Sequence, residues 1–262
     1  MSIRNEIASR LKKIEHEHSV EILFAVESGS RAWGFESIDS DYDIRFVYKH
    51  AVDWYLSIKK KRDVIEYPVD GVFDFSGWDI QKALKLFSKS NPPLLEWLRS
   101  PILYLEQGSL RKDLLDLEKK YFSPRACILH YFHMASGNYR EYLKTETVKT
   151  KKYLYVLRPL FACEWIKKDG TPPPMEFEKL ADEALASNPV RNQVFDLLSR
   201  KRTNEELGEG PAIPDLNRYV EEKLLFYEGY ASGLEKNLIE MEQLNLIFRT
   251  TIGLSKPGKT RC

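Results

Sequence analysis

The chain has 262 residues, of which 43% are hydrophobic and 30% charged, and its formal net charge is +1. This length allows one large domain or two small ones with a sizeable core, and the composition is typical of a soluble globular protein. The near-neutral charge excludes a global attraction to nucleic acid, so any such binding would need local basic patches.

Membrane and secreted classes are not favoured. No apolar run approaches the roughly 20 residues that span a bilayer, and the first residues lack the apolar core of a secretion signal. Cys127, Cys163 and Cys262 are odd in number and far apart, so they predict neither a disulfide framework nor a zinc site. We therefore expect a cytoplasmic protein without a membrane partner.

The first part of the chain is predicted to mix helices and strands. Apolar residues recur at helical spacing over residues 2–18, and residues 20–26 form a short apolar run typical of a strand. Apolar and polar residues alternate from 42 to 48, which predicts a second strand. Residues 64–69 and 72–76 flank Asp70-Gly71, a strong hairpin signal. Helices are expected over 80–88 and 94–99, and an edge strand over 102–105.

From about residue 108 the strand signals fade. Helices are predicted over residues 110–121, 124–143, 148–167, 175–186, 189–201 and 216–252. A run rich in Gly, Pro and Glu at 205–214 is typical of a linker. The sequence therefore predicts an α+β fold, with a mixed-sheet domain at 1–107, an all-helical domain at 108–254, a flexible tail at 255–262, and a cleft between the domains.

Chemistry is concentrated in residues 29–48. A Gly29-Ser30 turn is followed, after a short loop, by Asp41 and Asp43, which share one face of the predicted strand. Paired carboxylates on one rigid face suit Mg²⁺, which prefers oxygen ligands and completes its shell with substrate phosphate. Glycine at the turn allows close backbone approach to phosphate oxygens.

A third carboxylate stands on the second hairpin strand. Asp74 lies between Phe73 and Phe75, an unusual setting because aspartate is depleted in strands. Asp79, by contrast, is expected to cap the helix that follows it.

The string Gly29-Ser30, then Asp41-x-Asp43, resembles the signature of the DNA polymerase β-type nucleotidyltransferase superfamily. The fuller string Gly-Ser-Arg-Ala-Trp-Gly…Ser-Asp-Tyr-Asp-Ile-Arg resembles the RNA-repair-pathway DNA-polymerase-β-like (RlaP-like) family of predicted nucleotidyltransferases. The likeness continues through Gly77-Trp78-Asp79, Asn91-Pro92-Pro93 and the Lys-Lys-Tyr-Leu string that begins at Lys151. It covers most of the chain from about residue 20 to about 175.

The resemblance implies a catalytic mixed-sheet domain and a helical substrate-binding domain. It implies that Asp41, Asp43 and Asp74 are catalytic and hold two Mg²⁺ ions, with Mn²⁺ as an alternative. Gly29 and Ser30 would bind the β- and γ-phosphates of an NTP, with ATP the expected nucleotide.

Further nucleotide contacts are weighed against simpler structural roles. Arg31 follows the turn and could reach a triphosphate or lie on the surface; Arg45 could hold a phosphate, orient a carboxylate or form a structural ion pair. Lys151, Tyr155 and Arg158 share a helix face that could close over the phosphates. The alternative for that face is a solvated basic surface.

Other candidates have weaker signals. Trp33 and Phe35 could stack on a base, but packing under the loop is favoured. His130 and His133 are expected to be a partly buried structural pair, because Cys or carboxylate partners at zinc spacing are missing. Arg140 extends a basic surface toward a possible polynucleotide backbone.

The predicted activity is metal-dependent transfer of NMP from an NTP to an acceptor hydroxyl, with release of pyrophosphate. The family likeness implies an RNA 3′ end in RNA repair or processing as the acceptor. AMP transfer to a protein hydroxyl, as in toxin–antitoxin systems, and a non-catalytic nucleotide- or RNA-binding module remain the alternatives.

Overall fold

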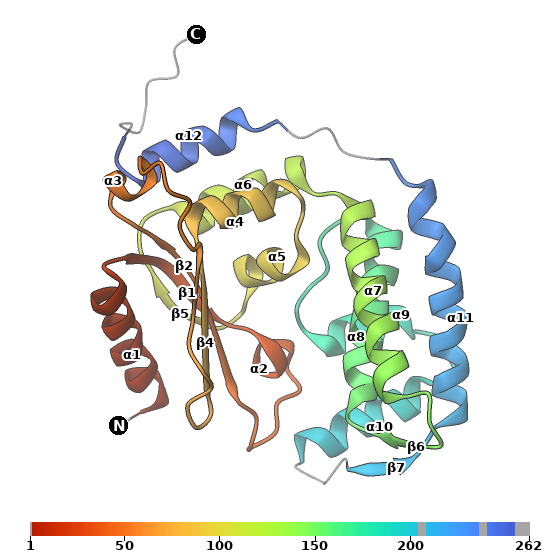
Figure 1. The fold of residues 1–262 in the computed structure, drawn as a ribbon. Helices are drawn as coiled ribbons and strands as arrows, with labels where there is room; N and C mark the ends of the chain where they lie inside the picture. The colour runs from red at the N-terminus through yellow and green to blue at the C-terminus, as the bar shows by residue number, and fades with distance from the viewer. Residues whose placement is uncertain (1, 204–207, 236–239, 255–262) are drawn as a thin grey trace.

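A five-stranded mixed sheet forms the first part of the molecule (Figure 1). The computed structural model describes residues 2–203, 208–235 and 240–254. The strands are β1 (Glu21–Glu27), β2 (Tyr42–Lys49), β3 (Val64–Glu66), β4 (Phe73–Asp79) and β5 (Leu103–Glu106), in the order β3-β4-β2-β1-β5. β2 and β4 run parallel, and the other neighbours run antiparallel. Because β2 is central, both of its edges are hydrogen-bonded and its side chains are held rigidly.

The two faces of the sheet have different roles. Helix α1 (Ile3–His18) covers one face and buries Ile7, Leu11 and Ile14 against it. The β2 residues on that face, Ile44 and Phe46 among them, are apolar. Since side chains alternate along a strand, Asp43 and Arg45 project from the opposite face. That face packs on α4 (Ile80–Ser88), α5 (Pro92–Arg99) and α6 (Leu110–Tyr121).

The second part is mainly helical, and Figure 1 shows its helices standing beside the sheet. It contains α7 (Pro124–Tyr142), α8 (Lys152–Asp169), α9 (Phe177–Ala184), α10 (Arg191–Arg202) and α11 (Pro214–Tyr230). α8 lies among the others and is buried along most of its length. One apolar core continues from the α4–α6 side of the sheet into these helices, so the two parts share their interior.

The α+β class and the main elements agree with expectation, with two corrections. A two-stranded ribbon forms in the part expected to have helices only: β6 (Thr147–Lys149) lies where the helix over 148–167 was expected to begin, and β7 (Glu209–Pro211) lies in the expected linker. The single helix expected over 216–252 is also wrong. α11 ends at Tyr230, a 3₁₀ turn follows at Ala231–Gly233, and α12 (Glu242–Thr251) packs on α4 and α6. Glycines at 229 and 233 weaken helix propensity at that break.

The proposed domain boundary after residue 107 stays a prediction. α6, which follows it, packs on α4, α5 and β1, and α12 returns to the same region. Residues 205–207 of the expected linker, and the tail at 255–262, lie outside the described residues. Among the described helices, none combines the length and the apolarity that a bilayer crossing requires.

Candidate active site

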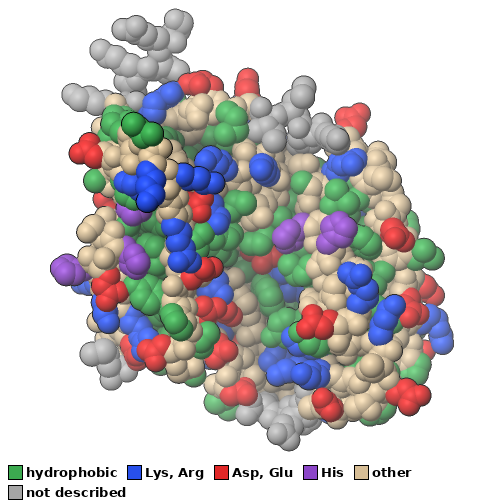
Figure 2. Space-filling view, viewed as in Figure 1, with side chains coloured by type: hydrophobic (Ala, Val, Ile, Leu, Met, Phe, Trp, Pro, Cys, Tyr) green, Lys and Arg blue, Asp and Glu red, His purple; other side chains and the backbone are tan. Residues whose placement is uncertain are grey.

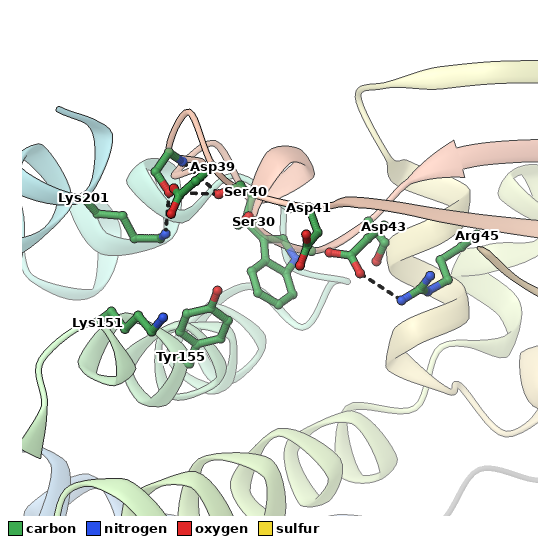
Figure 3. A pocket seen from close by; sticks show the side chains of 13 residues that line it. Ser30, Asp39, Ser40, Asp41, Asp43, Arg45, Lys151, Tyr155 and Lys201 are labelled. Carbon is green, nitrogen blue, oxygen red and sulfur yellow. Dashed lines mark hydrogen bonds and ion pairs between the residues drawn. The ribbon is translucent and has the colours of Figure 1, made fainter. Parts of the chain in front are cut away.

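A polar cavity of about 400 Å³ lies where the short helix α2 (Gly29–Trp33) and β2 meet the second part of the chain. Residues 28–45 supply most of its lining, and Lys151, Tyr155 and Lys201 supply the rest. Figure 2 shows this face hollowed between the two halves of the molecule, with Lys and Arg gathered at the lower right of the hollow. Figure 3 shows Asp41 and Asp43 at one end of the cavity and Lys151 and Lys201 at the other, with Asp39 beside Lys201.

Gly29 sits against the carboxylate of Asp43. Its φ is +59°, and a Cβ there would lie 2.0 Å from Asp43 Oδ2, so the position admits only glycine without rearrangement. The backbone N–H of Ser28 also donates to the Asp43 carbonyl, at 2.9 Å. The turn between β1 and α2 is thereby fastened to the strand that carries the acidic pair.

Asp41 and Asp43 both line the cavity. Asp41 is exposed just before β2, whereas Asp43 lies within the strand and is partly buried. Burial raises the pKa of the Asp43 carboxyl, and the negative charges of Asp74 and Asp41 raise it further, while Arg45 lowers it. This end of the cavity therefore carries crowded negative charge and would attract a cation.

Arg45 already supplies one positive charge there. It lines the cavity, and its Nη2 donates to Asp43 Oδ1 at 2.9 Å and to Asp74 Oδ2 at 2.7 Å. Asp74 is paired with Asp43 in the β2–β4 register. Arg45 therefore forms an ion pair that orients the carboxylates of Asp43 and Asp74, in line with one of the roles expected for it.

Two acidic residues of the cavity have the chemistry of metal ligands. Asp41 and Asp43 suit a hard divalent cation, because both are carboxylates that face one polar cavity. Asp74, the expected third metal ligand, fits this role less well. Among the described residues, no three His, Cys, Asp or Glu side chains are arranged so as to share an ion. Asp74 is not among the residues that line the cavity, and its carboxylate is bonded to Arg45, so its role as a metal ligand stays a prediction.

Arg31 and Arg158 are not among the residues that line the cavity, so the phosphate contacts expected of them stay predictions. Arg31 donates to the backbone carbonyls of Asp41, at 3.0 Å, and Ser40, at 2.6 Å. It therefore shapes the loop before β2. Arg158 is 2% exposed, and its Nη1 donates to Glu96 Oε1 at 2.9 Å. Helical spacing aligned Arg158 with Tyr155, but α8 is enclosed by its neighbours, so that part of the face is interior.

Trp33 forms part of the cavity wall, and its ring is held in place by contacts with Arg158 and Glu96. The Arg158 guanidinium lies 4.3 Å from its ring centroid, and its indole N–H donates to Glu96 at 3.4 Å. Phe35 is fully buried beneath the loop, as expected. Tyr155 lines the cavity, and burial and then the charges of Asp43 and Asp41 raise its pKa. Its phenol therefore keeps its proton and can donate a hydrogen bond.

Two residues of the site were not anticipated from the sequence. Glu27 ends β1 and is fully buried; it accepts a hydrogen bond from the Asp43 backbone N–H at 2.7 Å and another from the Tyr104 hydroxyl. Burial raises the pKa of Glu27 to about 7. A charged residue ending an apolar strand was the available signal. Lys201, from the last turn of α10, had no local signal, because only tertiary packing brings it to the cavity.

The remaining candidates lie outside the cavity lining. His130 is partly buried and His133 is exposed on α7, and within the described part of the chain neither belongs to a metal-competent cluster. Arg140 is exposed in the last turn of the same helix, and Lys144 is exposed just after that helix ends. Asp79 caps α4, with its carboxylate accepting from the Gln81 N–H, as expected.

Three comparisons with known proteins show what this chain is similar to. The RlaP family, described as the RNA repair pathway DNA polymerase beta family, matches residues 3–250. The uncharacterized protein YcgL of Bacillus subtilis (strain 168) is 44% identical over 251 residues, which cover 95% of this chain and 96% of that protein. The crystal structure of a nucleotidyltransferase-like protein from Exiguobacterium sibiricum 255-15 aligns with 91% of this chain and 78% of that one, at 14% identity and a TM-score of 0.31.

Proposed function

The chain belongs to the RNA repair pathway DNA polymerase beta family, as its motifs predicted, and we propose that it is an enzyme transferring NMP from an NTP to an acceptor hydroxyl. The observation that carries the proposal is the division of charge in one cavity. Asp41 and Asp43 lie at one end, and Lys151 and Lys201 at the other. A nucleoside triphosphate with a divalent cation near its α-phosphate carries the complementary charges.

The acidic end would hold the metal. Asp41 and Asp43 are the proposed ligands of Mg²⁺, or of Mn²⁺, and Asp74 is the predicted third ligand. A metal held by these residues would supply charge neutralisation at the attacking and leaving oxygens. Arg45 forms ion pairs with Asp43 and Asp74 and keeps their carboxylates oriented when no metal is bound.

The remaining residues of the cavity would position the nucleotide. Gly29 and Ser30 line the cavity from the first turn of α2, and the absence of a side chain at Gly29 lets this turn lie directly against the Asp43 carboxylate. Lys151 and the Tyr155 hydroxyl face the same space from α8 and its N-cap. In the reaction the acceptor oxygen bonds to the α-phosphorus as the bond to the β-phosphate oxygen breaks. Pyrophosphate leaves, and the hydroxyl proton is released to solvent. Alignment and charge neutralisation are what these side chains contribute.

An RNA 3′ end is the proposed acceptor, and the family's description supports it. The test is incubation with labelled ATP, CTP, GTP or UTP and Mg²⁺, with one RNA oligonucleotide that ends in a 3′-hydroxyl and a matched one that ends in a 3′-phosphate. A parallel tube contains cell lysate. Label on the hydroxyl-ended RNA alone is the expected result.

The other outcomes each contradict part of the proposal. Label on a protein band and not on RNA would replace the acceptor with a protein hydroxyl. If no tube shows label or pyrophosphate with any NTP, the transferase assignment fails in favour of a non-catalytic binding module.

A further inference from the structure

The last turn of α10 is clasped to the loop that leads into β2. Arg202 donates to the Gly34 carbonyl from Nε and Nη2, at 2.9 and 2.6 Å. Beside it, Lys201 Nζ lies 3.2 Å from Ser37 Oγ, a contact between residues 164 apart in sequence. These bonds fix the end of α10 at the rim of the cavity, with the Lys201 ammonium among the lining groups (Figure 3).

The environment of Lys201 disfavours its charge. Burial lowers the pKa of its ammonium; the negative charge of Asp39 opposes this, Lys151 lowers the pKa further, and Glu36 raises it. Asp39 lines the cavity near both lysines, but it is exposed on the loop, so water screens its charge. Two cations that face one polar cavity are a standing electrostatic cost, and an anion placed between them would relieve it.

We propose that Lys201 binds the terminal phosphates of the nucleotide, and that with Lys151 it makes the site select nucleoside triphosphates over monophosphates. This inference rests on the proposed function, because it assigns a ligand to the same cavity. Lys201 lies at the end away from Asp41 and Asp43, where the β- and γ-phosphates of a nucleotide whose α-phosphate meets the acidic pair would lie. An ammonium is a compact point charge that suits phosphate oxygens.

A purely structural role is the competing explanation. In that case Lys201 would act only by holding Ser37, and its loss would loosen the loop for every ligand alike. The number of phosphates on the ligand separates the two roles, because AMP lacks the groups that Lys201 is proposed to bind.

The experiment measures dissociation constants of ATP, ADP and AMP with Mg²⁺ and without acceptor, by isothermal titration calorimetry. The proteins are wild type, Lys201→Gln, Lys201→Arg and Ser37→Ala, and the matched control is Lys168→Gln, an exposed lysine of α8. In Lys201→Gln the dissociation constant of ATP should rise about tenfold or more, since a charged hydrogen bond is lost. That of AMP should stay within about twofold of wild type, as expected when no contact is removed. The ratio of the two constants should be preserved in Ser37→Ala and Lys168→Gln and largely restored in Lys201→Arg.

Three results would overturn the inference. Equal weakening of ATP and AMP in Lys201→Gln would make Lys201 a structural clasp. The same loss of discrimination in Ser37→Ala would assign it to the loop. A wild-type protein that does not prefer ATP to AMP would contradict the nucleotide site of the proposed function itself, a failure visible before any variant is compared. Thermal unfolding of each variant identifies any that does not fold. If Lys201→Gln does not fold, the ratio of the ATP and AMP dissociation constants is compared between Lys201→Arg and Ser37→Ala.

Discussion

Asp43 on β2 and Asp74 on β4 lie side by side on parallel strands, and one guanidinium nitrogen of Arg45 bonds to both carboxylates, at 2.9 and 2.7 Å. The same arginine also donates to the Asp74 carbonyl at 3.0 Å. A cation bound to these carboxylates would therefore compete with Arg45 for their oxygens. Arg45 is in effect a built-in counterion of the site.

Replacing Arg45 should increase the response to magnesium. Arg45→Gln leaves the carboxylates without a counterion, so they repel more strongly, and Mg²⁺ meets no competing guanidinium. The melting temperature of Arg45→Gln without metal should fall below that of wild type, and its rise on adding Mg²⁺ should be larger, since a ligand that binds the folded protein more tightly stabilises it more. Differential scanning fluorimetry measures both, with the exposed Arg62→Gln as control. Equal rises in Arg45→Gln and wild type would argue against a cation at these carboxylates.

Gly29 and Gly71 form a matched pair for testing close approach to Asp43. Both have positive φ, +59° and +63°. A Cβ added at Gly29 would strike Asp43, whereas a Cβ added at Gly71 would have no heavy atom within 4 Å other than those of Gly71 and its chain neighbours. Gly71→Ala should destabilise by about 1 kcal/mol from backbone strain alone. Gly29→Ala should destabilise by more and should also displace the Asp43 carboxylate. Urea unfolding compares the two variants, and equal losses would contradict the close approach.

Glu27 should make stability depend on pH. Its folded pKa of about 7 lies above the ordinary value of 4.5. The protonated form is therefore favoured by folding, and this contribution is fully present below about pH 4.5 and is lost as the pH rises through about 7. Glu27→Gln lacks this titration. Between about pH 5 and about pH 8, wild type should lose at most about 3 kcal/mol relative to the variant.

That comparison needs chelator present, so that bound cations do not alter the carboxylates nearby, and the exposed Glu36→Gln serves as control. Urea unfolding at the two pH values gives the difference. A Glu27→Gln variant that follows the wild-type pH profile would mean that Glu27 is ionised throughout.

The buried pair of Arg158 and Glu96 should behave as structure behind the site. Glu96 also accepts hydrogen bonds from Tyr131 and Trp33. Glu96→Gln would leave the guanidinium of Arg158 buried without its counter-charge, which typically destabilises by about 3–5 kcal/mol. The double variant Glu96→Leu with Arg158→Met removes both charges and should recover much of that loss. If Glu96→Gln unfolds like wild type in urea, the ion pair contributes little.

Local patterns predicted the parts of the site that are close in sequence. Alternation placed Asp43 and Arg45 on one face of β2, and Asp70-Gly71 marked the turn that leads into β4. Asp74 then lies beside Asp43 because β2 and β4 pair in parallel, an arrangement that no local pattern encodes.

The positions of the other site residues could not be predicted from local patterns, because they depend on which surfaces are buried when the chain folds. Arg158 lies on the same helix face as Tyr155, but α8 is enclosed by other helices, so spacing alone could not distinguish a cavity wall from core. Arg31 follows the Gly-Ser turn, yet its side chain donates hydrogen bonds to backbone carbonyls of the loop before β2. Lys201 reaches Ser37 across 164 residues, a contact that arises only when α10 packs against the first part of the chain.

The central claim is that Asp41 and Asp43 support nucleotidyl transfer, and the direct test is pyrophosphate release from labelled NTP, with the hydroxyl-ended RNA present, by wild type and by Asp41→Asn/Asp43→Asn. We expect release by wild type and none by the double variant. The variant's melting temperature should lie near or above that of wild type, because removing crowded charge relieves repulsion and Arg45 keeps Asp74 as a partner. Wild-type levels of pyrophosphate from a folded double variant would contradict the account.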